Sequence, residues 1–157
     1  MVKINLVAVG KVKEKYFLDG INEYAKRMGK FADFSIIEIG EENYTKVDDA
    51  LIESIKEKEA DKILPHLKGY VYCMAIEGKK MTSEQFAGQL EGLIDQGKGV
   101  ITFVIGGSYG LSNRVKSKAD KLFSFSDMTF PHTLFRLMLS EQIYRAFSII
   151  AGSSYHK

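Results

Sequence analysis

The sequence predicts an α/β fold in which helices cover both faces of one largely parallel, five-stranded sheet. Short apolar segments alternate with longer segments of helical periodicity along the whole chain. The run Val100–Ile105 consists entirely of β-branched and aromatic residues, which is typical of a strand buried on both faces of a parallel sheet. The 157 residues suffice for a hydrophobic core, and we expect a single domain over residues 1–157.

Two strands and two helices are predicted in the first part of the chain. The strands are Val2–Val9 and Asp33–Ile39, and the helices are Tyr16–Met28 and Asp48–Leu64. Both helical segments repeat apolar residues at every third or fourth position, and Gly29 and Pro65 mark their ends. The polar segment Gly40–Val47 is expected to be a loop.

The rest of the chain adds three predicted strands and three predicted helices. The strands are Tyr70–Ile76, Val100–Ile105 and Leu122–Phe125, and the helices are Thr82 to about Asp95, Ser112–Asp120, and Pro131 to about Ile150. Thr82 and Gln85 have the spacing of a capping box. Residues 77–80 are expected to form a tight loop. Proline favours the first turn of a helix, and Thr129 is a candidate for capping the last one.

The last helix is apolar on nearly every side. Its apolar residues are Leu134, Phe135, Leu137, Met138, Leu139, Ile143, Ala146, Phe147, Ile149 and Ile150. Such a helix is buried on several sides, yet the last helix of a small domain has few neighbours in its own chain. We expect a homodimer interface here, with deep burial inside one subunit as the alternative. A polar stripe remains at His132, Arg136, Ser140 and Tyr144, beside the pair Glu141 and Arg145.

Two strand-end loops predict a ligand site. Gly106, Gly107 and Gly110 follow the central strand, and a polar and aromatic segment, residues 123–132, follows the next one. Ligands of open α/β sheets bind at the carboxyl ends of the strands, and glycine lets them approach the backbone. Apolar walls and main-chain polar groups suit an adenosine, whereas the scarcity of basic residues disfavours a polyphosphate. A tight turn without a ligand is the alternative for the glycines.

Composition and missing motifs narrow the classes of protein to which the chain can belong. The net charge of +2 neither requires nor excludes a nucleic-acid partner. The single cysteine, Cys73, precludes an internal disulfide, suits the reducing cytoplasm and is expected in the core. The three histidines are scattered, so no metal site is predicted. We find no signal peptide, no segment of transmembrane length, no phosphate-binding Walker loop and no dinucleotide fingerprint.

Five segments together resemble a known family from end to end and in register. They are Leu6–Lys11, Phe103–Leu111, Phe123–Arg136, Glu141–Ala146 and Tyr155–Lys157. The chain is similar along these segments to the family of ribosomal RNA large subunit methyltransferase H, a small SPOUT-class enzyme. The resemblance implies a carboxyl-terminal trefoil knot, which general topology would not suggest.

The resemblance also implies a function. Enzymes of this family transfer a methyl group from S-adenosylmethionine to N3 of a pseudouridine in the 23S rRNA of the assembled ribosome, and they act as homodimers. The cofactor contacts carried over are Met74, Gly106, Phe125, Ser126, Asp127, Met128, Thr129 and Phe130. Met74 replaces the usual leucine, and a methionine can supply the same apolar wall.

Candidates for the chemistry itself lie near the carboxyl terminus. The N3 proton must leave, so a base or a group that stabilises the developing anion is expected. Arg136, Tyr155 and His156 are the catalytic candidates, and the terminal residues could complete the neighbouring subunit's site. For His132 and Glu141, helix-start hydrogen bonding and pairing with Arg145 are the favoured interpretations.

Ribosome contact and two rival functions complete the expectations. Lys11, Lys13 and Lys15 are a candidate phosphate-binding patch, although a solvated loop is the slightly favoured interpretation. One rival function is a flavodoxin-like protein that binds a flavin or nucleotide. The other is a non-catalytic ribosome assembly factor that retains the fold.

Overall fold

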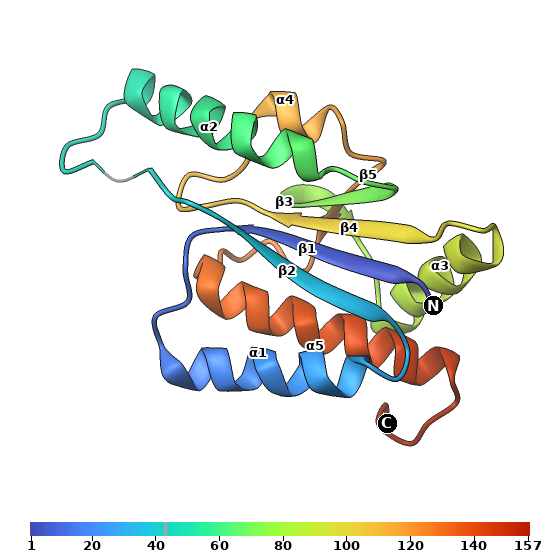
Figure 1. Cartoon of the computed structure of the whole chain (residues 1–157). Coiled ribbons are helices and arrows are strands. Elements are labelled where there is room, and N and C mark those ends of the chain that lie inside the picture. The colour runs from blue at the N-terminus through green and yellow to red at the C-terminus, as the bar shows by residue number, and fades with distance from the viewer. Residues whose placement is uncertain (43) are drawn as a thin grey trace.

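The computed structural model describes residues 1–42 and 44–157, and across them the chain forms a five-stranded sheet (Figure 1). The strands are β1 (Lys3–Val9), β2 (Asp33–Ile39), β3 (Tyr70–Lys80), β4 (Val100–Ile105) and β5 (Lys121–Ser124). Their order in the sheet is β2-β1-β4-β3-β5, and every pairing is parallel. The α/β fold with a parallel sheet is therefore confirmed, and β4 is its central strand.

The helices cover both faces of the sheet. They are α1 (Lys15–Met28), α2 (Asp49–Ile63), a short 3-10 turn η1 (Leu64–His66), α3 (Ser83–Asp95), α4 (Asn113–Lys116) and α5 (His132–Ile150). Figure 1 shows α1, α3 and α5 below the sheet and α2 and α4 above it. None of the described helices is long and apolar enough to cross a membrane.

Each face of the sheet has its own apolar core, because alternate residues of every strand point to opposite faces. On the α1, α3 and α5 side, Tyr72 and Phe103 stack at 4.8 Å between ring centroids, next to Phe86. On the α2 and α4 side, smaller side chains such as Val104 and Cys73 pack together. Cys73 lies in the core as predicted, and burial raises the pKa of its thiol to about 12.

Several helix ends follow the sequence rules. Thr82 and Gln85 form the predicted capping box, in which each side chain bonds the other residue's backbone N–H. The Asp48 side chain accepts a hydrogen bond from the backbone N–H of Leu51 and caps α2. The expected loop at residues 40–47 lies in part outside the described residues; those described there belong to neither a helix nor a strand.

Three local predictions were wrong. Residues 77–80 are not a loop, because β3 continues to Lys80. The helix expected over Ser112–Asp120 shrinks to the single turn of α4. The last helix begins at His132, with Pro131 at its N-cap, and no side chain caps it, so Thr129 does not serve that role.

The extension of β3 depends on a close contact between two backbones. β3 pairs with β5 in two stretches, and the register shifts between Met74 and Lys79. A β-carbon at Gly78 would lie 2.6 Å from the backbone carbon of Leu122 and the backbone nitrogen of Phe123. Gly78 therefore lets β3 lie directly against β5. Hydrophobic periodicity along the sequence does not reveal this contact between distant segments. The trefoil knot itself stays a prediction.

A methyl group at position 78 should destabilise the fold. The Gly78→Ala substitution forces apart two backbones, and overpacking of this kind costs about 1–3 kcal/mol. For a chain of this length that lowers the melting temperature by about 2–4 °C per kcal/mol, measured by thermal unfolding. Gly88→Ala is the control, because Gly88 lies in α3 with nothing within 4 Å of a new β-carbon. It should stabilise by about 1 kcal/mol; equal melting temperatures for both variants would contradict the contact.

Candidate functional site

A pocket of about 750 Å³ lies at the carboxyl ends of β3, β4 and β5. Its walls come from the segment after Met74, the glycine-rich turn after β4, and the loop between β5 and α5. Parallel strands end at the same edge of a sheet, so these segments meet although they are distant in the sequence. The two loops predicted to share one site are therefore brought together.

The turn after β4 is closed on itself. Gly110 donates its backbone N–H to the carbonyl of Gly107 at 3.1 Å, and it adopts a φ of +81° that favours glycine. A β-carbon at Gly106 would lie 2.7 Å from the backbone carbon of Gly110. The glycines are therefore needed for the turn, and they also leave its backbone open toward the pocket.

Serine hydroxyls hold the loop between β5 and α5. Ser124 Oγ donates to the carbonyl of Ser126 at 2.9 Å, and Ser126 Oγ accepts from the backbone N–H of Met128 at 3.1 Å. Phe125 and Phe130 pack against Phe135 of α5, with ring centroids 4.8 and 6.3 Å apart. The loop is thus fixed by local hydrogen bonds, and it presents aromatic rings to the pocket.

Seven of the eight predicted cofactor-binding residues line this pocket. They are Met74, Gly106, Phe125, Ser126, Met128, Thr129 and Phe130. The eighth, Asp127, is exposed outside the lining, where its carboxylate pairs with Lys80 at 2.5 Å. His132, the first residue of α5, also lines the pocket.

One ion pair borders the pocket. Lys116 of α4 and Glu77 of β3 both line it, with Nζ and Oε1 2.7 Å apart. The hydrogen bond from Lys116 lowers the pKa of Glu77, which is therefore ionised at neutral pH. The charges offset each other, so the pocket presents mainly apolar and main-chain groups.

Arg136 is buried and already engaged. Its side chain is only 3% exposed, pairs with Glu38 at 2.5 Å and donates to the carbonyl of Gly10 at 3.0 Å. Its Nε has no hydrogen-bond partner among the residues that the structure describes. Arg136 thus ties the start of α5 to the ends of β1 and β2.

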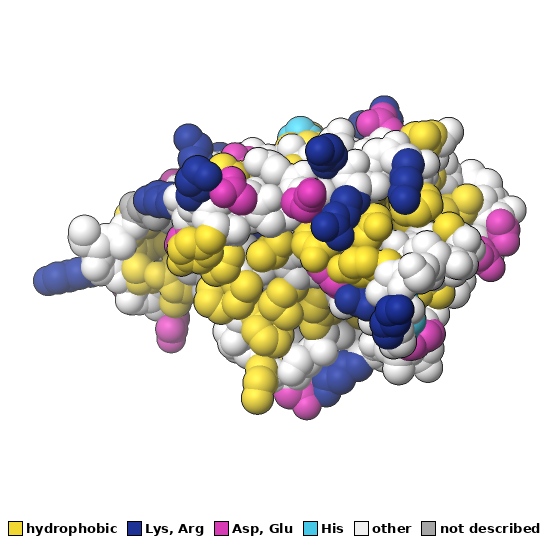
Figure 2. All heavy atoms as spheres, turned by 90° about the horizontal axis from the view of Figure 1, so that it is seen from below, with side chains coloured by type: hydrophobic (Ala, Val, Ile, Leu, Met, Phe, Trp, Pro, Cys, Tyr) yellow, Lys and Arg dark blue, Asp and Glu magenta, His cyan; other side chains and the backbone are white. Residues whose placement is uncertain are grey.

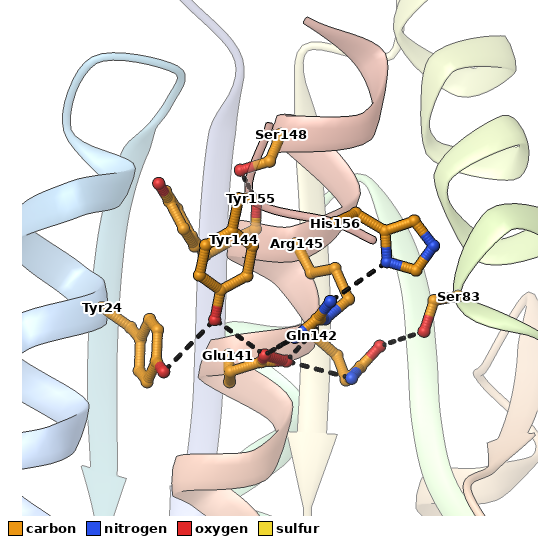
Figure 3. A network of polar contacts seen from close by, with 9 residues as sticks. All are labelled: Tyr24, Ser83, Glu141, Gln142, Tyr144, Arg145, Ser148, Tyr155 and His156. Atoms are coloured by element: carbon orange, nitrogen blue, oxygen red, sulfur yellow. Dashed lines mark hydrogen bonds and ion pairs between the residues drawn. The ribbon is translucent and has the colours of Figure 1, made fainter. Parts of the chain in front are cut away.

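Tyr155 and His156 belong to a separate polar network, shown in Figure 3. Tyr155 donates its hydroxyl to Glu141 at 3.0 Å and lies 3.3 Å from the hydroxyl of Tyr24 on α1. Burial, together with these two contacts, raises the pKa of Tyr155, which stays a neutral donor. Glu141 also accepts hydrogen bonds from Arg145, as its spacing predicted.

His156 continues the network toward α3. Its Nδ1 lies 3.0 Å from Arg145, and its Nε2 lies 2.7 Å from Glu84. Arg145 can only donate, so Nδ1 accepts and the proton of the neutral ring belongs on Nε2. Ser83 and Gln142 add a second link between α3 and α5 at 2.7 Å. The carboxyl-terminal tail is therefore held between α1 and α3, and neither Tyr155 nor His156 lines the pocket.

A second cavity, of about 660 Å³, lies over α5 between α1 and α3. Glu141 and Tyr24 line it, so the tail network borders it. Phe123, Phe125 and Phe130 line both cavities. An aromatic wall therefore separates the pocket that holds the predicted cofactor residues from the groove beside the predicted catalytic tail.

Sequence reasoning missed several polar residues of these regions. Tyr24 follows the apolar pattern of α1 and gave no signal. Glu59 lies on the apolar face of α2, between Ile55 and Ile63, and is 4% exposed. A carboxylate at that position of an apolar stripe was the available signal. Among the described residues, no group of three or more His, Cys, Asp or Glu side chains is placed to hold a metal ion.

Comparisons with known proteins agree with this architecture. A sequence profile described as predicted SPOUT methyltransferase matches residues 2–156. A curated protein of Lactobacillus gasseri named ribosomal RNA large subunit methyltransferase H is 54% identical, over 99% of this chain and 100% of its own.

Two solved structures share the fold at low sequence identity. A probable methyltransferase from Bordetella pertussis is 10% identical, with a TM-score of 0.59 over 93% of this chain and 96% of its own. A Legionella pneumophila protein, described as a methyltransferase with the cofactor SAM bound, is 11% identical, with a TM-score of 0.51 over 95% of this chain and 66% of its own. With the profile match over nearly the whole chain, these findings lead to one conclusion: the chain belongs to the SPOUT methyltransferase family.

Proposed function

We propose that this protein is a methyltransferase that uses S-adenosylmethionine to methylate N3 of a pseudouridine in the 23S rRNA of the assembled ribosome. The observation that carries the proposal is the pocket at the carboxyl ends of β3, β4 and β5, together with family membership. The name of the Lactobacillus gasseri relative supports the choice of large-subunit rRNA. The same membership disfavours a flavodoxin-like protein.

The pocket fits the cofactor that the family implies. Aromatic rings at Phe125 and Phe130 and the side chain of Met74 suit an adenine ring. The bare backbone at Gly106 and Gly107 offers hydrogen-bonding groups that side chains would otherwise cover. S-adenosylmethionine supplies an activated methyl group on a sulfonium sulfur. These residues would orient it and exclude water, which an in-line transfer requires.

The accepting nitrogen carries a proton that must be removed. Arg136 is engaged with Glu38 and Gly10, so its proposed part is to position the start of α5 and the neighbouring His132. Tyr155 and His156 remain the candidates for contact with the base. They lie across the aromatic wall from the cofactor pocket of their own subunit, and we propose that they serve the pocket of a partner.

A homodimer would bring tail and pocket together. The outer side of α1 and α5 carries the hydrophobic side chains that Figure 2 shows gathered on one face. Tyr16 of α1 is 69% exposed, and Leu137 and Met138 of α5 line the groove beside it. Soluble proteins rarely expose such apolar surface without a partner. We infer that a second copy of the chain covers this face.

A ribosomal substrate leads to two further proposals, on the location of the protein and on its contact with phosphate groups. A protein that modifies bacterial ribosomes works in the cytoplasm. Lys11 and Lys13 are exposed in the loop after β1, whereas Lys15 pairs with Asp19 at 2.8 Å. The phosphate-binding patch therefore stays a prediction, with Lys11 and Lys13 as its freest cations.

Methyl transfer is the first prediction for this function. The protein is incubated with methyl-labelled S-adenosylmethionine and ribosomes from cells that lack the modification. A parallel sample contains the naked rRNA of the same ribosomes in place of the ribosomes. Label should enter the rRNA of ribosomes and not naked rRNA, because the assembled particle is the substrate. Cofactor binding without label in either sample would favour the non-catalytic assembly factor.

Removal of the tail should separate chemistry from cofactor binding. Deletion of residues 155–157 is expected to lower turnover by about 10²-fold, the usual contribution of a proton-transfer group. The Kd for S-adenosylmethionine should stay within about twofold, because the tail does not line the pocket of its own subunit and its proposed contact in the partner's pocket is with the base. Tyr155→Phe is the matched variant, since it keeps the ring packed on Tyr144 and removes the hydroxyl. Unchanged turnover after the deletion would refute the role.

A charge on the outer face of α1 should break the dimer. Tyr16→Glu places a carboxylate on the proposed interface, and sedimentation equilibrium should shift from dimer to monomer. Tyr44→Glu is the control, because Tyr44 is exposed to 42% near α2, where Lys58 bonds it at 3.1 Å. A wild-type protein that sediments as a monomer at micromolar concentration would overturn the interface.

A further inference from the structure

Carboxylates gather behind the glycine-rich turn of the cofactor pocket, on the side of the sheet covered by α2. Glu41 and Glu42 come from the segment after β2, and Glu59 comes from the third turn of α2. Glu59 is 4% exposed, and the backbone of Glu42 lies close enough to lower the pKa of its carboxyl group in part. Buried carboxyl groups are rare unless they are paired or protonated.

Two of these carboxyl groups meet at Gly107. A β-carbon at Gly107 would lie 3.4 Å from Oε1 of Glu41 and 3.4 Å from Oε1 of Glu59. Ser108 donates its hydroxyl to Oε1 of Glu41 at 2.9 Å. Gly107 and Ser108 both line the pocket. The position of the turn therefore depends on the two carboxyl groups that support it from behind.

The cations of the neighbouring elements are engaged elsewhere. Lys62 of α2 bonds Glu42 at 3.1 Å, and Arg114 of α4 bonds Asp61 on the outer side of α2 at 2.5 Å. Burial raises the pKa of Glu59, and the charges of Glu41 and Glu42 raise it to a smaller degree. The backbone of Glu42 and the charge of Lys62 lower this pKa, but they offset the increase only in part. Two ionised carboxylates at one glycine would repel each other, and this repulsion favours the protonated form of the buried one.

His132 faces the same region from α5. A β-carbon at Gly10 would lie 3.4 Å from Nε2 of His132 and 3.2 Å from Oε2 of Glu41. The imidazole of His132 and the carboxyl group of Glu41 therefore both lie next to Gly10.

We propose that Glu59 is a positioning residue that works un-ionised: its neutral carboxyl group supports the Gly107–Ser108 turn and keeps the pocket in the shape that receives S-adenosylmethionine. The inference rests on the proposed function and names a residue outside the pocket lining on which cofactor affinity depends. Ionisation of Glu59 places a second negative charge beside Glu41, and the turn moves away from it.

The direction of the pH dependence follows from the raised pKa. The neutral form is complete at acidic pH, and it is lost as the pH rises through the folded-state pKa of Glu59. Both the contribution of Glu59 to stability and the affinity for the cofactor therefore fall as the pH rises above the ordinary glutamate range. At its steepest, a binding equilibrium linked to one proton changes by about tenfold per pH unit.

Glu59→Gln tests the proposal, because glutamine keeps the shape and cannot ionise. The Kd for S-adenosylmethionine is measured by calorimetry from about pH 5 to about pH 9, a range around the reference pKa values, with melting temperatures in parallel. The ionisation of the cofactor itself affects both proteins equally, so its effect cancels in the ratio of the wild-type Kd to the variant Kd. This ratio should be near one at low pH and rise with pH. Glu53→Gln, an exposed site on the same helix, should follow wild type throughout.

A second variant separates support from charge. Glu59→Ala removes both the supporting side chain and its charge, so it should bind the cofactor more weakly than Glu59→Gln at every pH. If Glu59→Gln binds the cofactor worse than wild type at low pH, Glu59 does not act as a neutral support and the inference is wrong. The same holds if the ratio of the wild-type Kd to the Glu59→Gln Kd does not change with pH. Failure of the wild-type protein to bind S-adenosylmethionine at any pH would instead overturn the proposed function.

Discussion

Close contact between backbones is the constraint on which the rest of this structure depends. Gly78 lets β3 lie against the backbone of β5, and Gly106 lets the turn after β4 close onto Gly110. A side chain at either position would meet backbone atoms within 3 Å, which a rotamer change cannot relieve. Because these contacts fix where the strand ends lie relative to one another, they also fix the walls of the pocket. The shape of the pocket is therefore set by backbone packing, and its polar residues act within that shape.

Charged residues in this protein serve mainly to hold elements in place. Arg136 is the strongest example, because a buried guanidinium that pairs with Glu38 and bonds the Gly10 carbonyl joins α5 to β1 and β2. Glu38 is 43% exposed, so its removal would leave the buried guanidinium with the Gly10 carbonyl as its remaining described partner. Glu59 plays a comparable part on the opposite face of the sheet, where it supports the turn at Gly107. Both residues act on the pocket through the segments they position.

The proposed division of labour explains why the pocket and the polar tail network lie apart within one chain. The pocket proposed for the cofactor is lined mainly by apolar and aromatic side chains and main-chain groups, as a site that excludes water should be. The tail network around Glu141 is polar, and it is shared among α1, α3, α5 and the terminal residues (Figure 3). An aromatic wall that includes Phe125 separates them. A two-fold arrangement of subunits offers a way to place the tail of one against the pocket of the other without dismantling either.

The sequence by itself determined most of the elements, the parallel sheet and the central place of Val100–Ile105, because hydrophobic periodicity and turn chemistry are local signals. The seven predicted residues that line the pocket came from the resemblance to a known family, which is also a property of the sequence. The tertiary structure decided what depends on distant backbone. It extended β3 to Lys80, where Gly78 meets β5, and it moved Asp127 out of the pocket to Lys80. It also buried Glu59 and Arg136, whose partners lie in other elements. Local patterns could not reveal these features, since each depends on which segments the strand order β2-β1-β4-β3-β5 places side by side.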